Sequence, residues 1–384
     1  MTPMTHRQRA VAAIRGEPVD HLPFIGRMEL WYNYNHNRGT LPERYRGWSL
    51  WDLQRDLGIG IFGFGAWSAS FYRFEYYGMD VRRTTVGDEV VVEYLTPYGT
   101  IRARNLLAEE LRDADVTGAQ VEHEFKDERD YDALLYVLEH TRVVENYEEY
   151  GKIVEAIGED GLALPFSGWV PMHLLMHHYM GYETFYYQLH DNTAKVERLH
   201  QALVEQQRQI LKLGARCPAE VVEVGANYDE EMTPPGVFAK YMLPFYQEAA
   251  AILHGGGKLM AAHLDGEMRR LLELIPATGL DVAEAITPAP MTSIDVRRTR
   301  ALWKDQVALW GGIPTVLLTS TFSDEEFERY VLDLFAAVAP GDRFILGFGD
   351  NAPTDALFPR LAKTAQLWRK YGKYPLQTST LPKV

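Results

Sequence analysis

Short apolar runs alternate with segments of helical periodicity along most of the chain. One clear pair begins with GLALPFSG (161–168), an apolar run that closes in polar and glycine residues. A helix is predicted to follow from near Asp191 and Asn192, because apolar residues then recur at helical spacing. That stripe comprises Val196, Leu199, Leu203, Ile210 and Leu213. Eight apolar runs of this kind are present, at 21–26, 58–64, 161–168, 220–226, 258–263, 281–286, 307–312 and 343–349.

Strands that are apolar throughout and alternate with helices are typical of a parallel sheet covered on its faces by helices. Eight such units match the number in a (β/α)8 barrel. The sequence shows no low-complexity tract or interdomain linker. We therefore predict the α/β class and a single TIM barrel domain over residues 1–384.

One stretch breaks this alternation. Residues 72–105 alternate β-branched and aromatic residues with polar ones, and VGDE (86–89) and TPYG (96–99) have the composition of turns. We expect antiparallel strands inserted after the second barrel strand, in a β-rich excursion over 72–125. The acidic segment 123–161 is expected to form exposed helices that lead back to the third strand.

Charge and cysteine content narrow the functional classes. A formal net charge of −14 argues against binding to a nucleic-acid backbone, which needs a concentrated basic face. No apolar run approaches the roughly 20 residues of a spanning helix, and the first residues lack the pattern of a signal peptide. We expect a cytoplasmic protein without a membrane partner. Cys217 is the only cysteine, so one chain cannot supply a disulfide or a zinc site with two thiolates.

Polar residues gather where the predicted strands end, which is where such a barrel carries its catalytic groups. From the first run to the eighth these residues are Arg27, Glu29, Ser167, Trp169, Asn227, Asp229, His263, Asp265, Glu284, Asp350 and Asn351. Each has a structural alternative: Asp265 could cap a helix, Asp350 could form a turn, and His263 could be a packed core residue. The convergence of the acidic groups, the amides and the imidazole from five of these strands favours a single polar site.

Six segments, in this order and spacing, carry a family resemblance. They are MTHRQRAVAAIRGEPVDHLPF (4–24), HHYMGYETFYYQLHDNTAKVERL (177–199), HLDG (263–266), GLDVAEAITPAPMTSIDVRRTRALW (279–303), LWGGI (309–313) and FILGFGDNAPTDALFPRLAKTAQLWRKYGKYPL (344–376). Together they resemble the uroporphyrinogen decarboxylase superfamily. The resemblance implies a (β/α)8 barrel with one of two activities. One is cofactor-free decarboxylation of porphyrinogen acetates, and the other is methyl transfer from a methylated corrinoid carried on a partner protein.

The decarboxylases of this superfamily carry an arginine-rich N-terminal signature that binds substrate carboxylates. The equivalent stretch here, FIGRMELWYNYN (24–35), keeps Arg27 but lacks a second arginine. A substrate with many carboxylates needs several cationic partners. The resemblance therefore favours methyl transfer, and a porphyrinogen-type decarboxylase is the alternative enzyme.

The thiol-dependent methyltransferases of the superfamily hold zinc with an HxC motif and a later cysteine. The corresponding stretches here are HLDG and GFGDNAP, which keep His263 and place Asp265 and Asp350 where sulfur ligands stand. Oxygen ligands suit thiolate-zinc chemistry poorly, so we expect no thiolate-bound zinc. If a metal binds, its predicted ligands are His263, Asp265 and Asp350.

The phrases TPYGT (96–100) and EAITPAP (284–290) resemble the branch that serves aryl-ether O-demethylation, in which some members pass the methyl group to tetrahydrofolate. A ring amine needs no metal to become a nucleophile, but it needs positioning and a proton carrier. Under this resemblance, His263, Asp265 and Asp350 are the predicted catalytic residues. The predicted substrate-binding residues are Asn227, Glu284, Asn351, Arg27, Glu29 and Trp169.

A corrinoid protein is the expected partner, and it needs an open rim around the site. Aromatic residues near the predicted loops could supply it: Trp31, Tyr32, Tyr34, Trp67, Trp169 and Tyr228. The histidine-rich MHLLMHHYM (172–180) indicates a helical surface or a subunit contact, which would allow a homodimer. A third reading, from another class, is a non-catalytic protein that binds a corrinoid or another tetrapyrrole.

Overall fold

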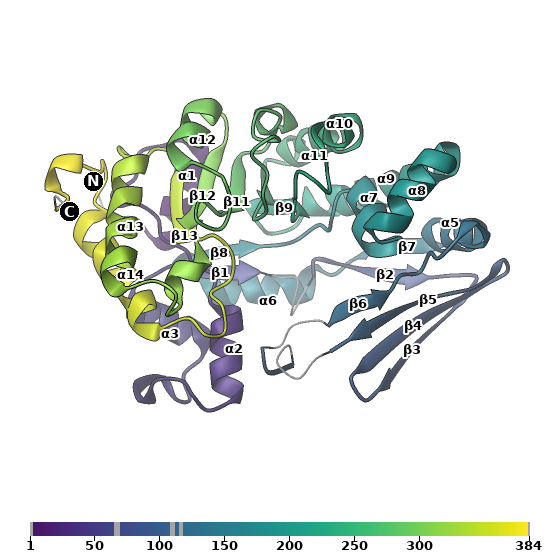
Figure 1. Ribbon diagram of the computed structural model, residues 1–384, viewed down its shortest axis with the longest axis horizontal. Coiled ribbons are helices and arrows are strands. Elements are labelled where there is room, and N and C mark those ends of the chain that lie inside the picture. The colour runs from purple at the N-terminus through teal and green to yellow at the C-terminus, as the bar shows by residue number, and fades with distance from the viewer. Residues whose placement is uncertain (1–2, 65–69, 108–111, 115–117, 383–384) are drawn as a thin grey trace.

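Parallel strands form the centre of the molecule in the computed structural model, which describes residues 3–64, 70–107, 112–114 and 118–382 (Figure 1). Five strands pair in the order β13-β12-β11-β10-β9, and a separate parallel pair joins β1 to β8. Their bounds are β1 Ile61–Phe64, β8 Gly161–Leu164, β9 Val221–Ala226, β10 Leu259–His263, β11 Val282–Ile286, β12 Ala308–Ile313 and β13 Phe344–Phe348.

Isolated parallel bridges connect these two groups of strands. Phe24 pairs with Leu346 of β13, and the next residue, Ile25, pairs with Gly60 just before β1. At the end of β8, Phe166 pairs with Glu223 of β9. All eight predicted apolar runs thus take part in parallel pairing, and the predicted α/β class is confirmed.

The first predicted run, 21–26, differs from expectation because it forms bridges and no continuous strand. Pro23 lies within it and has no N–H group to donate to a neighbouring strand. Its carbonyl still accepts a hydrogen bond from the Leu346 N–H at 2.9 Å. The run therefore keeps its place beside β13 with fewer backbone hydrogen bonds.

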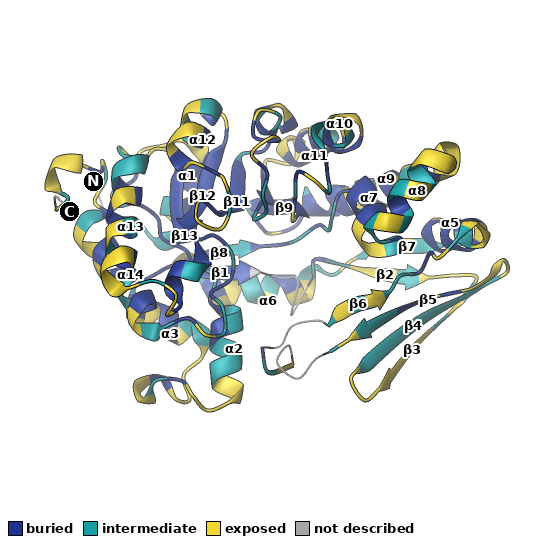
Figure 2. Ribbon diagram, viewed as in Figure 1, coloured by how far each residue is buried: buried dark blue, intermediate teal, exposed yellow. Residues whose placement is uncertain are grey.

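Helices surround the parallel strands, and their inward faces are buried (Figure 2). The α-helices are α1 His6–Arg15, α2 Glu29–Asn37, α3 Leu50–Leu57, α5 Tyr131–Glu139, α6 Tyr147–Ile157, α7 Pro171–His173, α8 Tyr182–Asp191, α9 Thr193–Gly214, α10 Pro235–Val237, α11 Leu243–Gly255, α12 Val296–Trp303, α13 Asp324–Val338 and α14 Phe358–Tyr371. Two π-helical segments, η4 Leu174–Tyr179 and η5 Phe238–Met242, interrupt this pattern. The short 3-10 helices are η1 Glu43–Tyr45, η2 Glu128–Asp130, η3 Gly158–Asp160, η6 Ile275–Thr278, η7 Thr315–Leu318 and η8 Thr378–Thr380.

Helix α9 confirms the helix that was predicted from apolar spacing. All five residues of the predicted stripe are buried in it: Val196, Leu199, Leu203, Ile210 and Leu213. Burying one aliphatic side chain of this size contributes about 1.5–3 kcal/mol before the entropy cost of ordering it. The apolar stripe therefore holds this long helix on the core.

Antiparallel strands form a second β structure away from the parallel strands (Figure 1). Four of them pair in the order β3-β4-β5-β6, and the two flanking strands β2 and β7 pair with each other. Tight turns join β3 to β4 at Gly87 and β4 to β5 at Pro97, within the two segments predicted as turns. The bounds are β2 Tyr72–Tyr76, β3 Asp80–Val86, β4 Glu89–Thr96, β5 Gly99–Leu106, β6 Ala119–Glu122 and β7 Thr141–Glu145.

The expectation of exposed helices over 123–161 was wrong for α5 and for β7. Helix α5 buries Tyr131, Leu134 and Val137, and β7 is a strand paired with β2. Although the segment is acidic, apolar residues recur at helical spacing in α5, and these residues pack in the main core. Net charge of a segment is therefore a poor guide to its exposure here.

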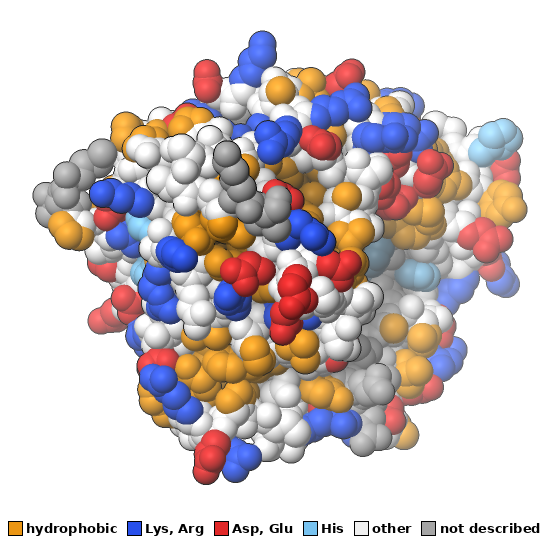
Figure 3. All heavy atoms as spheres, turned by 60° about the vertical axis from the view of Figure 1, so that its left-hand side comes forward, with side chains coloured by type: hydrophobic (Ala, Val, Ile, Leu, Met, Phe, Trp, Pro, Cys, Tyr) orange, Lys and Arg blue, Asp and Glu red, His pale blue; other side chains and the backbone are white. Residues whose placement is uncertain are grey.

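The surface that faces the viewer in Figure 3 carries Lys and Arg side chains interspersed with Asp and Glu. No helix in the described part of the chain combines the length and the apolar character needed to cross a bilayer.

Gly161 tests the pairing of β1 with β8. A methyl group added at Gly161 would overlap the backbone of Ile61, its partner in the register, so Gly161→Ala should destabilise the protein by about 1–3 kcal/mol. Gly151 lies inside α6 with open space around it, and Gly151→Ala should stabilise the protein by about 0.5–1 kcal/mol. Urea denaturation of both variants measures the difference. Equal effects of the two changes would contradict the close approach of β8 to β1.

Candidate active site

His263 is the last residue of β10 and lies at the centre of a group of charged side chains. Its Nδ1 lies 2.5 Å from Glu284 Oε2, and its Nε2 lies 3.6 Å from Asp265 Oδ2 and 3.8 Å from Asp350 Oδ1. His263 and Glu284 are register partners on the parallel strands β10 and β11, so their side chains leave the sheet side by side. Asp265 lies two residues after the end of β10, and Asp350 lies two residues after the end of β13.

Arg27 brings a positive charge into the same group. Its Nη1 lies 3.1 Å from Asp350 Oδ1 and 3.2 Å from His263 Nδ1. Its guanidinium also lies over the ring of Phe62, 5.2 Å from the ring centroid. Because His263 Nδ1 donates its proton to Glu284, the contact with Arg27 is a close approach of two cations. Asp350 and Glu284 offset that repulsion.

The protonation of this group follows from its burial and its charges. Burial opposes a charge on His263, but Glu284 and Asp265 outweigh burial and hold the pKa of His263 well above its usual range. Burial acts against the charge of Asp265 as well, yet the nearby positively charged ring of His263 keeps the Asp265 pKa below its usual value. Arg27 and His263 are thus two cations that face the carboxylates of Asp265, Glu284 and Asp350.

Glu223 completes the group and was missed by the sequence analysis. It lies within β9, is 1% exposed, and its carboxylate approaches His263 and Glu284 closely enough for the three to share a metal ion. Neither of its carboxylate oxygens has a hydrogen-bond partner among the described residues. Burial and the neighbouring Glu284 raise the pKa of Glu223 to about 8, so it is a neutral acid at pH 7. We call Arg27, Glu223, His263, Asp265, Glu284 and Asp350 the acid–histidine cluster.

Glu29 and Asn351 lie beside the cluster and fix the start of α2. The Asn351 amide donates to Glu29 Oε2 at 3.1 Å, and its oxygen accepts from the Leu30 N–H at 3.0 Å. Burial raises the pKa of Glu29, although Arg27 partly opposes that rise. Both ends of the Asn351 amide are therefore already hydrogen-bonded within the protein.

Asn227 is exposed just after β9, and its backbone N–H donates to the His263 carbonyl at 3.0 Å. Its φ of 53° is in the left-handed region, which asparagine tolerates better than most residues. Two other strand-end residues have structural contacts. Ser167 is fully buried and donates to the Glu223 carbonyl at 2.9 Å, and Asp229 accepts from the Glu231 N–H at 2.8 Å.

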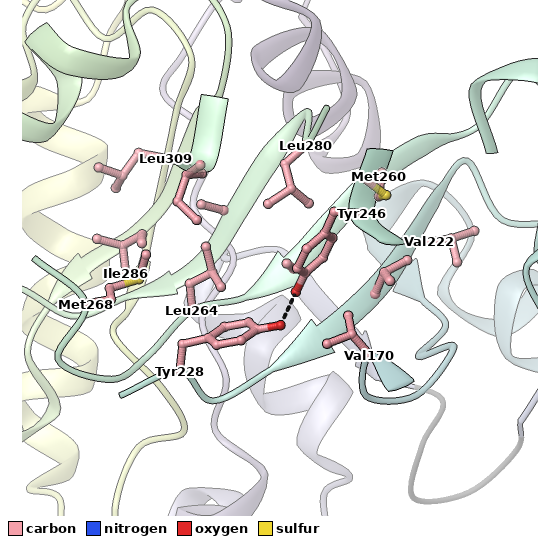
Figure 4. Packing of buried hydrophobic residues seen from close by; sticks show 14 of the residues in the cluster. Val170, Val222, Tyr228, Tyr246, Met260, Leu264, Met268, Leu280, Ile286 and Leu309 are labelled. Carbon is pink, nitrogen blue, oxygen red and sulfur yellow. Dashed lines mark hydrogen bonds between the residues drawn. The ribbon is translucent and has the colours of Figure 1, made fainter. Parts of the chain in front are cut away.

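The predicted aromatic rim is wrong at two of its six positions. Trp31 is 2% exposed, donates to the Ala356 carbonyl and packs against Phe358. Tyr228 is 1% exposed, and its hydroxyl lies 3.0 Å from the Tyr246 hydroxyl in the core (Figure 4). These two aromatic side chains turn inward, where their rings pack against other aromatic rings and their polar atoms are hydrogen-bonded.

The other rim positions differ in their environment. Tyr32 and Tyr34 on α2 are half-buried, and so is Trp169 after β8. The predicted Trp67 lies outside the described residues. In the histidine-rich segment, His173 is fully buried and stacks on Tyr228 with ring centroids 4.9 Å apart, so this part is not a surface.

Two sets of side chains have the spacing of metal ligands: Glu223, His263 and Glu284, and the predicted set of His263, Asp265 and Asp350. Both sets need the His263 ring to lose a proton, and Arg27 already pairs with Asp350, a member of the second set. The one thiol of the chain, Cys217, is buried and precedes β9, at the opposite end of that strand from Asn227. The cluster therefore offers oxygen and nitrogen ligands without sulfur.

The arrangement suits proton handling and the binding of a polar ligand. A neutral acid, a charged imidazole and two partly exposed carboxylates lie within a few ångströms of one another, at side-chain exposures of 20% for Asp265 and 41% for Asp350. Groups with pKa values pushed in opposite directions are typical of acid–base sites.

Comparisons with known proteins agree with this architecture. Among solved structures, a methyltransferase from Methanosarcina mazei aligns with a TM-score of 0.57 at 13% sequence identity, covering 96% of this chain and 98% of that chain. A Listeria monocytogenes protein provisionally named a vitamin-B12-independent methionine synthase aligns with a TM-score of 0.40 at 11% identity, covering 91% of this chain and 96% of that one. The first alignment supports a shared fold. No curated protein matches the chain.

The family comparison is more specific. The family model described as uroporphyrinogen decarboxylase (URO-D) matches residues 110–370, which is more than half of the chain. The match includes β8 to β13 and five of the six members of the acid–histidine cluster. The chain therefore belongs to the uroporphyrinogen decarboxylase family.

Proposed function

We propose that the protein is a methyltransferase that moves a methyl group between a corrinoid, carried by a partner protein, and a small amine acceptor. Tetrahydrofolate is the favoured acceptor. The observation that carries the proposal is the charged imidazole of His263 held among three carboxylates at the ends of the strands. Family membership and the fold shared with the Methanosarcina mazei methyltransferase support it. We further propose that the eight parallel runs form a closed (β/α)8 barrel in a single domain.

The residues of the cluster have separate roles in this proposal. A methylated corrinoid supplies the methyl group when it is bound. The acceptor amine loses a proton as its nitrogen–carbon bond forms, and Asp350, the most exposed carboxylate of the cluster, takes that proton and passes it to water. Asp265 has a lowered pKa and stays ionised, so it serves better as a fixed hydrogen-bond acceptor for the ring N–H groups of the acceptor molecule. His263, held by Glu284, orients both carboxylates.

A porphyrinogen-type decarboxylase is the second candidate. It must neutralise several substrate carboxylates, whereas the cluster contains one arginine, and that arginine is paired with Asp350 at 3.1 Å. Asp265 and Asp350 would repel such a substrate. A non-catalytic protein that binds a corrinoid or another tetrapyrrole is the third candidate. Such a protein would bind its ligand without transferring a methyl group, so an activity assay distinguishes it from the first candidate.

Consumption of methylcobalamin in the presence of tetrahydrofolate tests the proposal. We expect turnover that needs the acceptor and survives a metal chelator, and an Asp350→Asn change, which removes the proposed proton acceptor, should lower its rate by about 100-fold. Asp355→Asn is the matched control, since Asp355 is exposed on the loop that follows Asp350. No turnover with tetrahydrofolate or with a thiol would contradict methyl transfer. Release of carbon dioxide from uroporphyrinogen would favour the decarboxylase.

Glu284→Gln tests the state of His263. The carboxylate of Glu284 is a main reason why the His263 pKa exceeds 6.5, so removing its charge should lower that pKa towards or below 6.5. Nitrogen-15 NMR of the imidazole, assigned with a His263→Gln variant, should show two protonated nitrogens at pH 7 in the wild type and a neutral ring in Glu284→Gln. Glu124→Gln, which changes a buried carboxyl outside the cluster, is the control. An unchanged His263 titration in Glu284→Gln would contradict the pairing.

Glu223→Gln tests whether the buried Glu223 has a raised pKa. The folded protein keeps a proton on Glu223 up to about pH 8, whereas an ordinary glutamate loses it near 4.5. Between these values the native state binds more protons than the unfolded state, so the stability of the wild type should fall as the pH rises and level off above 8. Glu223→Gln has no such proton to lose. The difference in unfolding free energy between the variant and the wild type, measured by urea denaturation, should therefore grow from about pH 5 to pH 8, and a constant difference would contradict a raised pKa.

A further inference from the structure

A cleft of about 1100 Å³ lies between the four-stranded antiparallel sheet and the helical segment η4–α8. Figure 1 shows the sheet β3–β6 below α7 and α8, and Figure 3 shows histidine side chains beside a hollow at the right of the molecule. None of the described residues that line the cleft belongs to the acid–histidine cluster. This volume slightly exceeds the usual range for small-molecule sites.

One face of the sheet forms the first wall. Arg83 is the register partner of Val92, and Val90 is the register partner of Asn105, so these four side chains share one face of the sheet. Arg82 pairs with Glu93 and lies on the opposite face. The wall therefore presents a guanidinium, an amide and two apolar side chains to the cleft.

Aromatic rings form the second wall. Trp169 and His177 lie with their ring centroids 4.2 Å apart at an interplanar angle of 33°, and Tyr182 meets the edge of His177 at 5.7 Å. All three residues line the cleft. A half-buried indole beside a second ring is suited to stacking on a planar ligand. His177 lies in a π-helical segment, a distortion that is often found at functional sites.

The charge of the lining differs from that of the whole chain. The protein has 53 acidic residues among 384 and a net charge of −14, yet the described residues that line the cleft include no aspartate or glutamate. Arg83 lines it instead, together with three histidines, His123, His177 and His178. Burial lowers the pKa of His177 and brings that of His178 to about 4, so these two rings act as neutral hydrogen-bonding groups beside the charge of Arg83. A wall of donors with no carboxylate among its described residues favours an anion over a cation.

The cleft also lies close to the cluster. Trp169 packs on His173 with centroids 4.6 Å apart, His173 stacks on Tyr228, and the neighbouring Asn227 is hydrogen-bonded to the backbone of His263. The sheet residues of the first wall precede the part of the chain that matches the family model, which begins at residue 110. The first wall therefore lies outside the part of the chain that matches the family model.

We propose that this cleft is a second binding site, which takes a planar aromatic anion by stacking on Trp169 and by pairing with Arg83. The proposal does not depend on methyl transfer, because binding is measured directly. A failure to bind therefore leaves the proposed activity untouched, and a failure of the activity leaves binding untouched.

Isothermal titration calorimetry with two probes of the same ring tests the proposal. We expect 1-pyrenecarboxylate to bind at least about tenfold more tightly than 1-pyrenemethylamine, its cationic counterpart. Arg83→Gln should weaken binding of the anion at least about fivefold, whereas Arg82→Gln, the neighbouring change on the other face of the sheet, should leave it unchanged. Trp169→Ala should weaken binding of both probes.

Asn105→Asp gives a second test that keeps the shape of the side chain. It adds a carboxylate to the wall, so it should weaken binding of the anion and strengthen binding of the cation. Circular dichroism verifies the fold of each variant. Equal or tighter binding of the cation to the wild type would overturn the proposal, and so would equal effects of Arg82→Gln and Arg83→Gln. If Asn105→Asp bound both probes with the affinities of the wild type, the proposal would be overturned as well.

Discussion

The buried contact between His263 and Glu284 is the interaction on which the arrangement of the cluster depends. The two strands that carry these residues are parallel neighbours in register, so the backbone itself brings the imidazole and the carboxylate together. A charged pair at this depth is stable only when both partners are present. Its presence keeps a positive charge beside Asp265 and Asp350, and this charge, together with that of Arg27, lets the two carboxylates share a small volume.

Much of the fold could be predicted from the sequence, because its parallel strands are apolar throughout and its long helix α9 carries a regular apolar stripe. The same strategy failed for Glu223. A single acidic residue inside an apolar strand was treated as part of the strand, although its burial is the signal that it serves the site. Trp31 and Tyr228 were misplaced because residue type near a strand end does not reveal which way a ring turns. That direction depends on packing against distant residues such as Phe358 and Tyr246.

The two sites described here differ in electrostatic character. The acid–histidine cluster holds carboxylates in excess over its cations, whereas the cleft beside it has no acidic side chain among its described lining residues. Ring contacts lead from Trp169 at the cleft through His173 to Tyr228, next to Asn227 at the end of β9. The two proposed ligands therefore differ in what the protein must recognise: a planar aromatic anion in the cleft, and the ring N–H groups of an amine acceptor at the cluster.

The single cysteine has a practical consequence. Cys217 is 1% exposed and lies before the start of β9, at the far end of the strand from Asn227. Because burial also raises the pKa of its thiol, it is a poor nucleophile toward maleimides and spin labels. A cysteine introduced on the antiparallel sheet would then be the reactive thiol of the molecule. With a second cysteine introduced on the helices opposite, the distance between the two labels would report the position of the sheet relative to those helices.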